Sequence, residues 1–259
     1  MFFDIKGLKV YYEVVGSGRP VLLLHGWGVD SQSMRPIAHY VNTPLGARAY
    51  ALDFPGFGLS DTPQAAWAVD DYVQVVVELL DQLQLDTVDL IAHSFGGRVA
   101  IKLAAQTPQR VNRMVLVGCA GIRPDRTAGY YVKVTAAKAT RRLTRLLPGP
   151  LGERVRATIL SRLGSRDYRS AGKLRGTFVK VINEDLRHVL PHIQAPVLLV
   201  WGDSDTETPL KDGHLMAELI PQARLVVLPK TGHYCYLDDF PAFSRALLSF
   251  LDPVLTRDS

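Results

Sequence analysis

The sequence predicts an α/β protein with a doubly wound, mostly parallel sheet. Short continuous runs of Val, Leu and Ile recur along the chain, which is typical of strands buried on both faces. Segments with helical periodicity lie between several of these runs, and this alternation is the pattern of a parallel sheet covered by helices. The 259 residues are enough for one large domain with an insertion.

The apolar runs define the expected strands. In chain order they are Leu8–Val15, Pro20–Leu24, Ala47–Leu52, Val88–Ala92, Arg113–Val117, Pro196–Trp201 and Arg224–Leu228. Helical periodicity extends over Asp70–Leu85 and Gly96–Gln106, and Asp70 or Asp71 is the expected N-cap of the first of these helices.

The alternation breaks between residues 122 and 193. Helical pieces such as Tyr130–Leu147 and Gly152–Leu163 follow one another there, and no run resembles a strand. The stretch is also basic, because residues 123–190 hold 16 Lys and Arg against five Asp and Glu. We therefore expect a helical insertion at 122–193 in a core domain formed by residues 1–121 and 194–259.

Composition narrows the class of protein. No run reaches about 18 apolar residues, so no membrane span is expected. The N-terminus lacks the basic start and apolar stretch of a signal peptide, which favours a cytoplasmic protein. Cys119 and Cys235 form neither a disulfide framework nor a metal site. Gly16-Ser17-Gly18 precedes a strand and opens no helix, so it is no dinucleotide fingerprint and no cofactor is expected.

The strongest motif is Ala92-His93-Ser94-Phe95-Gly96-Gly97, between an expected strand and an expected helix. Small residues two places before and after a serine let the two backbones approach closely, as in the nucleophile elbow G-x-S-x-G. Ala92 departs mildly from that pattern by one methyl group. The alternative is a serine that only caps the helix.

A second motif, His25-Gly26-Trp27-Gly28, follows the strand Pro20–Leu24. Backbone N–H groups in such a loop can point at a developing oxyanion. We expect the N–H groups of Trp27 and Phe95 to form this oxyanion hole, and His25 to have a structural role.

These motifs resemble those of the α/β-hydrolase superfamily, and the resemblance extends over the whole chain. Asp53-Phe54-Pro55-Gly56-Phe57-Gly58-Leu59-Ser60 is similar to the family's D-x-x-G-x-G-x-S loop. Trp201-Gly202-Asp203-Ser204-Asp205 and Lys230-Thr231-Gly232-His233 match the positions of the family's acid and histidine. The order Ser, Asp, His is the one expected for this fold. The resemblance places the insertion after the family's sixth strand, as a cap over the pocket.

The resemblance implies a catalytic triad of Ser94 as nucleophile, His233 as general base and Asp205 as the acid that orients the histidine. Asp203 is the alternative acid, but the family's W-G-x-x-D pattern selects Asp205. Cys235 lies two residues after His233, unusually close for a nucleophile and its base, and Ser94 is the better candidate.

The expected activity is hydrolysis of carboxylic esters of small or medium acyl chains through an acyl-enzyme on Ser94. A serine at the elbow argues against dehalogenases and epoxide hydrolases, which use aspartate there. Carbon–carbon bond hydrolases of ring-cleavage products and slow-turnover hydrolase-fold receptors remain alternatives.

A small-molecule ester is the expected partner, and neither nucleic acid nor a particular oligomeric state is indicated. The loops also resemble those of esterases for pimeloyl-carrier methyl esters. An acidic acyl carrier would fit the basic insertion, and helices with solvated basic faces would explain the charge equally well.

Overall fold

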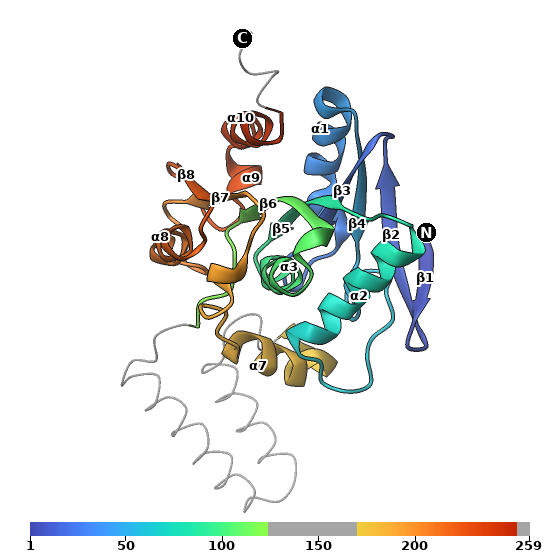
Figure 1. The fold of residues 1–259 in the computed structure, drawn as a ribbon. Helices are drawn as coiled ribbons and strands as arrows, with labels where there is room; N and C mark the ends of the chain where they lie inside the picture. Colours follow the sequence, from blue (N-terminus) through green and yellow to red (C-terminus); the bar gives the residue numbers. More distant parts are fainter. Residues whose placement is uncertain (124–169, 253–259) are drawn as a thin grey trace, which may run out of the picture.

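The computed structural model describes residues 1–123 and 170–252 (Figure 1). In this part of the chain, one sheet of eight strands has the order β1-β2-β4-β3-β5-β6-β7-β8. The pairs β1–β2 and β2–β4 are antiparallel. The neighbouring strands β4, β3, β5, β6, β7 and β8 are parallel to one another. The strands are β1 Phe2–Ile5, β2 Leu8–Val15, β3 Arg19–Leu24, β4 Ala47–Leu52, β5 Val88–His93, β6 Val111–Val117, β7 Val197–Gly202 and β8 Ala223–Leu228.

Helices cover both faces of the sheet, as a doubly wound fold requires (Figure 1). Leu22 and Leu24 of β3 pack with helices on one face, whereas Val21 and Leu23 pack with helices on the other. The first face carries α2 Val69–Gln82, α3 Phe95–Gln106 and α8 Leu210–Leu219, and the second carries α1 Arg35–Leu45, α9 Cys235–Asp238 and α10 Phe240–Leu251. Short 3₁₀ turns lie at Ser31–Met34, Pro108–Arg110, Gly172–Leu174 and Leu190–His192.

The predicted fold class is confirmed, and every predicted strand is present with bounds that differ by at most two residues. The predicted N-cap of α2 is wrong. The helix begins after Ala68, and the Asp71 carboxylate in its first turn accepts a hydrogen bond from the Ala68 N–H at 2.8 Å. This is half of a capping box, because alanine has no side-chain acceptor to complete it.

The segment between β6 and β7 contains the predicted insertion. Its pieces Tyr130–Leu147 and Gly152–Leu163 lie outside the described residues. The described part holds α7 Arg175–Asn183, which is bound to the loop before α2 by a 3.0 Å hydrogen bond from Trp67 N–H to Thr177 Oγ1. The Leu186 N–H donates to the Gly121 carbonyl at 2.9 Å, so the residue before the predicted insertion contacts a residue in its last part.

None of the helices in residues 1–123 and 170–252 is long and apolar enough to cross a bilayer. The same residues contain no group of three or more His, Cys, Asp or Glu side chains arranged to hold a metal ion.

Candidate active site

Ser94 lies at the sharp turn between β5 and α3. Its backbone has φ 50° and ψ −112°, a conformation that costs a non-glycine residue about 1–3 kcal/mol. Three hydrogen bonds hold the strained turn. The Ser94 N–H donates to Val117 O at 3.0 Å, and the Ser94 carbonyl accepts from the N–H groups of Gly97 and Ala120 at 3.0 and 3.1 Å. Ser94 is half-buried, so the turn presents its hydroxyl at the carboxyl end of the sheet.

The small residues around Ser94 are required by close backbone contacts. A methyl group on Gly96 would lie 2.5 Å from the Leu24 carbonyl oxygen of β3. On Gly97 it would lie 2.2 Å from Cys119 Sγ. The one departure from the elbow pattern, Ala92, is fully buried in the core on the α3 side, so its methyl group fits without displacing the turn.

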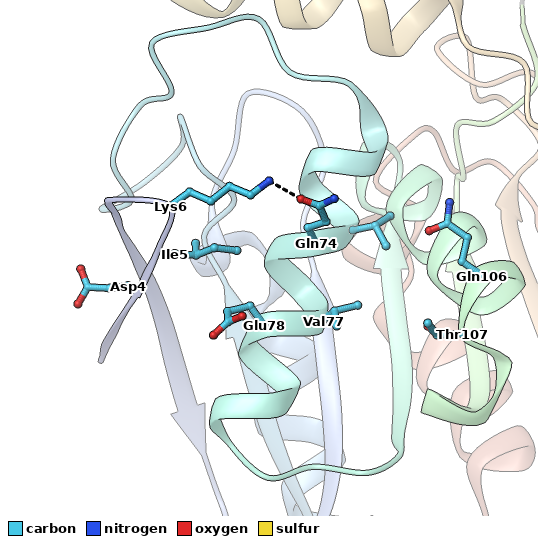
Figure 2. Close-up of a pocket in the computed structure, with 9 residues that line it drawn as sticks. Asp4, Ile5, Lys6, Gln74, Val77, Glu78, Gln106 and Thr107 are labelled. Carbon is cyan, nitrogen blue, oxygen red and sulfur yellow. Dashed lines mark hydrogen bonds between the residues drawn. The ribbon is translucent and has the colours of Figure 1, made fainter.

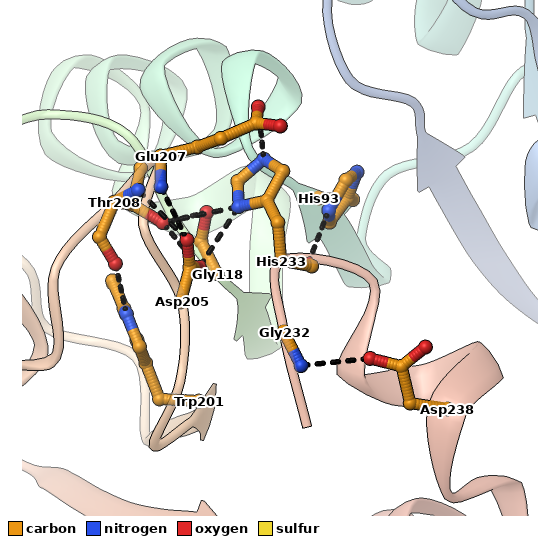
Figure 3. A network of polar contacts seen from close by, with 9 residues as sticks. All are labelled: His93, Gly118, Trp201, Asp205, Glu207, Thr208, Gly232, His233 and Asp238. Carbon is orange, nitrogen blue, oxygen red and sulfur yellow. Dashed lines mark hydrogen bonds and ion pairs between the residues drawn. The ribbon is translucent and has the colours of Figure 1, made fainter. Parts of the chain in front are cut away.

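His233 and Asp205 are brought together from the loops after β8 and β7 (Figure 3). His233 Nδ1 lies 2.8 Å from Asp205 Oδ2, and both residues are buried. Asp205 Oδ1 accepts from the N–H groups of Glu207 and Thr208 at 2.8 and 2.9 Å, and Oδ2 also accepts from Thr208 Oγ1 at 2.8 Å. Burial alone would raise the pKa of this carboxyl. The bonds from His233 and Thr208 outweigh that effect and lower the pKa, so Asp205 stays ionised.

Asp203, the alternative acid, has other partners. It is exposed, and its Oδ1 accepts from Ser204 Oγ at 2.8 Å and from the Lys230 N–H at 2.8 Å. These contacts shape the turn between β8 and His233. The structure therefore pairs His233 with Asp205, the acid that the sequence pattern selects.

The second ring nitrogen of His233 lies near Glu207. Nε2 lies 3.6 Å from the carboxylate of Glu207, whose side chain is 59% exposed. Among the described residues, Ser94 Oγ and His233 share no hydrogen bond. Hydrogen bonds between a nucleophile and its base are often long before substrate binds, so this absence does not exclude Ser94 as the partner of His233.

Trp27 and Phe95, the expected oxyanion-hole residues, lie beside Ser94. A methyl group on the preceding Gly26 would be 3.3 Å from Ser94 Cβ, which places this loop against the elbow. Phe95 is the first residue of α3, where backbone N–H groups lack intrahelical partners. The two aromatic rings pack edge to face with centroids 5.4 Å apart.

His25, by contrast, points into the core. It is fully buried, and its Nε2 accepts from the Phe54 N–H at 3.0 Å. This bond ties the loop after β3 to the loop after β4, and it fits the structural role expected for His25.

A cavity of about 660 Å³ opens above Ser94. Its walls come from the β3 and β6 loops, the first turns of α3, the helix α7 and the loop after β7. The described lining residues are Trp27, Ser94, Phe95, Arg98, Ala120, Ile122, Arg123, Phe178, Val181, Ile182, Thr206, Glu207, Thr208, Pro209, Lys211 and Asp212. This cavity is lined by Ser94, the predicted nucleophile, and by Glu207 and Thr208, which contact the His233–Asp205 pair.

A second hollow of about 510 Å³ lies between β1, α2 and the carboxyl end of α3 (Figure 2). Lys6 and Gln74 form a hydrogen bond there, and no His or Cys lines it. α3 has 12 residues, so the hollow lies roughly 18 Å from Ser94 along the helix axis. We therefore take the cavity above Ser94 as the candidate active site.

Comparison with known proteins places this geometry in a family. A family model described as alpha/beta hydrolase fold matches residues 19–240. The chain belongs to the α/β-hydrolase fold family. It is 30% identical over 248 residues to a pimeloyl-[acyl-carrier protein] methyl ester esterase of Nitrosomonas europaea, with 90% of this chain and 95% of the relative covered. It is 28% identical to a 2-hydroxymuconate semialdehyde hydrolase of Pseudomonas putida, with 91% and 88% covered.

Among solved structures, an esterase from Exiguobacterium antarcticum superposes on this α/β hydrolase with a TM-score of 0.74 and 25% identity. The match covers 96% of this chain and 98% of the esterase. The relatives named here are hydrolases, and this chain shares their fold.

The cysteines of this α/β hydrolase do not compete with Ser94. Cys119 and Cys235 are both buried, and burial raises the pKa of each thiol to about 12. A thiol protonated at neutral pH is a poor nucleophile, so neither cysteine can replace the serine.

Two residues of the hydrolase site have contacts that the sequence pattern did not indicate. His93 is fully buried beneath the site, and its Nε2–H donates to the His233 carbonyl at 3.0 Å. Burial and the neighbouring His233 lower the pKa of His93 to about 3, so the ring stays neutral. Thr208 supports Asp205 through both its N–H and its hydroxyl. The sequence offered no signal for either contact beyond nearness to the motifs.

Proposed function

We propose that this α/β hydrolase cleaves carboxylic esters of small or medium acyl chains through an acyl-enzyme on Ser94. One observation carries the proposal: a serine at a strained strand-to-helix turn lines a cavity together with Glu207 and Thr208, whose N–H groups bind the carboxylate of the buried His233–Asp205 pair. That combination supplies a nucleophile, a base and a group that orients the base.

The proposed chemistry follows from the contacts. The Asp205 carboxylate accepts a hydrogen bond from Nδ1–H of His233, so Nε2 carries the lone pair that takes the Ser94 proton. Ser94 Oγ attacks the ester carbonyl, and the N–H groups of Trp27 and Phe95 are proposed to bind the oxyanion. His233 then protonates the departing alcohol. Water attacks the acyl-enzyme by the same sequence, and the carboxylic acid and Ser94 are released.

An organophosphate labelling experiment tests the nucleophile. Wild type and Ser94→Ala are compared in hydrolysis of p-nitrophenyl acetate to octanoate, and intact mass is recorded after reaction with a fluorophosphonate. Rapid turnover and one adduct in wild type, both lost in Ser94→Ala, are expected. Ser204→Ala is the matched control, because Ser204 lies in the loop of Asp205 but its hydroxyl faces Asp203. Turnover that survives Ser94→Ala would contradict the proposal.

A second candidate is carbon–carbon bond hydrolysis, favoured by the 28% identity to the 2-hydroxymuconate semialdehyde hydrolase. The same triad would serve it, since pocket shape decides the substrate. Turnover of 2-hydroxymuconate semialdehyde at a kcat/KM well above that for the p-nitrophenyl esters would favour this candidate. Labelling of Ser94 with negligible turnover of both substrate classes would instead favour a ligand receptor.

The proposed partner is the ester substrate itself. An acidic acyl carrier at the basic insertion stays a prediction, supported by the 30% identity to an esterase named for an acyl-carrier substrate. Most of residues 123–190 lie outside the described residues.

A further inference from the structure

Arg98 is a cation in the cavity of Ser94 that the proposed chemistry does not use. It lies one helical turn after Ser94 on α3, so both residues face the same side of the helix. Both line the cavity, and Arg98 is 4% exposed. One helical turn of four residues places the two Cα atoms about 6 Å apart along the axis.

The carboxylates near Arg98 are bound by other cations. Its one hydrogen bond among the described residues is from Nη1 to the backbone carbonyl of Glu184, at 2.8 Å. The Glu184 carboxylate instead accepts from Lys102 Nζ at 2.6 Å, and Asp185 pairs with Arg187. Arg98 therefore forms no ion pair within the described part of the chain.

A buried guanidinium without a carboxylate partner is costly, because its hydration is lost without compensation. A guanidinium has five N–H donors, of which one is used here. The other charged residues in the described lining balance one another in number: Arg123 and Lys211 against Glu207 and Asp212. The described lining therefore has a formal net charge of one positive unit, which corresponds to Arg98.

We propose that Arg98 is a specificity-determining residue that binds a carboxylate of the substrate while its ester group is held at Ser94. The inference rests on the proposed function and narrows its substrate class to esters that carry a second, anionic group. Arginine suits this role, since its planar fork binds a carboxylate with two parallel hydrogen bonds.

Two substrate pairs test whether Arg98 binds a carboxylate of the substrate, and whether that carboxylate belongs to the acyl or the alcohol part of the ester. For the acyl side, the p-nitrophenyl monoester of adipic acid is compared with p-nitrophenyl hexanoate, which has the same chain length. For the alcohol side, 4-acetoxybenzoate is compared with phenyl acetate. Arg98→Met is expected to lower kcat/KM for the anionic member of at least one pair by about 10- to 100-fold. The neutral member should change less than about 3-fold, and Arg98→Lys should recover part of the loss.

Lys102→Met is the matched control. It removes a cation one further turn along the same helix face and breaks the bond to Glu184, but Lys102 does not line the cavity. If Arg98 only anchors the segment at Glu184, both variants should slow the anionic and neutral esters equally. That result, or an unchanged ratio in both pairs with Arg98→Met, would overturn the inference.

A binding measurement separates failure of the inference from failure of the proposed function. Monomethyl adipate and methyl hexanoate are added to Ser94→Ala, and thermal unfolding is recorded. Greater stabilisation by monomethyl adipate, lost in Ser94→Ala/Arg98→Met, is expected even if no ester is turned over. Equal stabilisation by both ligands, or no stabilisation by either, would refute the role of Arg98 and leave the proposed chemistry at Ser94 to its own test.

Discussion

Replacement of Asp205 by asparagine tests how the site orients its histidine. Oδ1 accepts from two backbone N–H groups, so the amide NH₂ cannot occupy that position without facing two donors. The amide oxygen must therefore take the place of Oδ1, and the NH₂ must take the place of Oδ2. There it faces His233 Nδ1 at 2.8 Å.

The substitution should thus reverse the histidine tautomer. Thr208 Oγ1 can accept from the new amide while it donates to Gly118 O at 3.0 Å, so only the imidazole must adapt. Nδ1 becomes the acceptor, and the proton moves to Nε2, which can no longer take the Ser94 proton. We expect Asp205→Asn to lower kcat by about 10⁴, equivalent to about 5.5 kcal/mol of transition-state stabilisation, with little loss of folding stability.

The assay is steady-state hydrolysis of p-nitrophenyl butyrate, with ¹⁵N NMR of His233 as a direct readout of the tautomer. Asp203→Asn is the matched control, because Asp203 is exposed and its carboxylate accepts from Ser204 and Lys230 and not from His233 in the described part of the chain. The control should stay within about 3-fold of wild type. The reasoning is refuted if folded Asp205→Asn retains more than a tenth of wild-type kcat, or if Asp203→Asn loses as much.

Three further predictions concern the packing and electrostatics around the site. Gly97→Ala should lower the free energy of unfolding by about 1–3 kcal/mol through its clash with Cys119 Sγ, and Cys119→Ala should restore part of it. A urea double-mutant cycle with coupling below about 0.5 kcal/mol would count against this clash. Because the folded-state pKa of His93 is about 3, below its value of 6.5 in the unfolded chain, the unfolded state binds the proton first as pH falls. The free energy of unfolding should therefore fall from about pH 6.5 towards pH 3, by up to about 1.4 kcal/mol per pH unit. Urea unfolding at pH 7 and at pH 4.5 should show a smaller loss of this free energy for His93→Gln than for wild type. An equal loss in both proteins would exclude His93 as the cause. Thr208→Val removes the hydroxyl, whose single proton can be donated to Asp205 or to Gly118, but keeps the N–H bond. We expect kcat/KM to fall about 10-fold, less than for Asp205→Asn; a loss as large would show that the hydroxyl alone orients the carboxylate.

Buried strands were the elements that the sequence predicted best. β4 has the predicted bounds, because a mostly apolar run between turn residues identifies a strand covered on both faces. β2 has the predicted bounds as well, although most of its residues are only half-buried. β1 was missed, since its four residues alternate between exposed and buried positions at the sheet edge. α1 was missed as well. Its sequence ends in Asn, Thr and Pro, which are poor helix formers, and packing of Ile37 and Val41 on the sheet sustains it.

The residues of the candidate site could also be predicted only in part from the sequence. Ser94, Asp205 and His233 could be proposed because each follows a recognisable strand, and parallel strands bring their carboxyl ends to one edge. The contacts of Arg98 and His93 could not, since their partners lie 86 and 140 residues away in the chain. Such pairings depend on how loops fold back over the sheet, which local periodicity does not encode.

The hydrogen bond between Gly121 and Leu186 affects how the segment between these two residues can vary in length and sequence. A segment whose two ends already touch can be lengthened, shortened or exchanged while the strands on either side keep their register. For a flexible segment, doubling the length adds only about 0.6 kcal/mol of closure entropy. New pocket walls can therefore be tried by insertion and deletion at a low entropic cost, as long as the contacts of α7 and Glu184 with the core are kept or replaced. Chimaeras joined at these two residues are a practical way to give the same edge of the sheet new substrates.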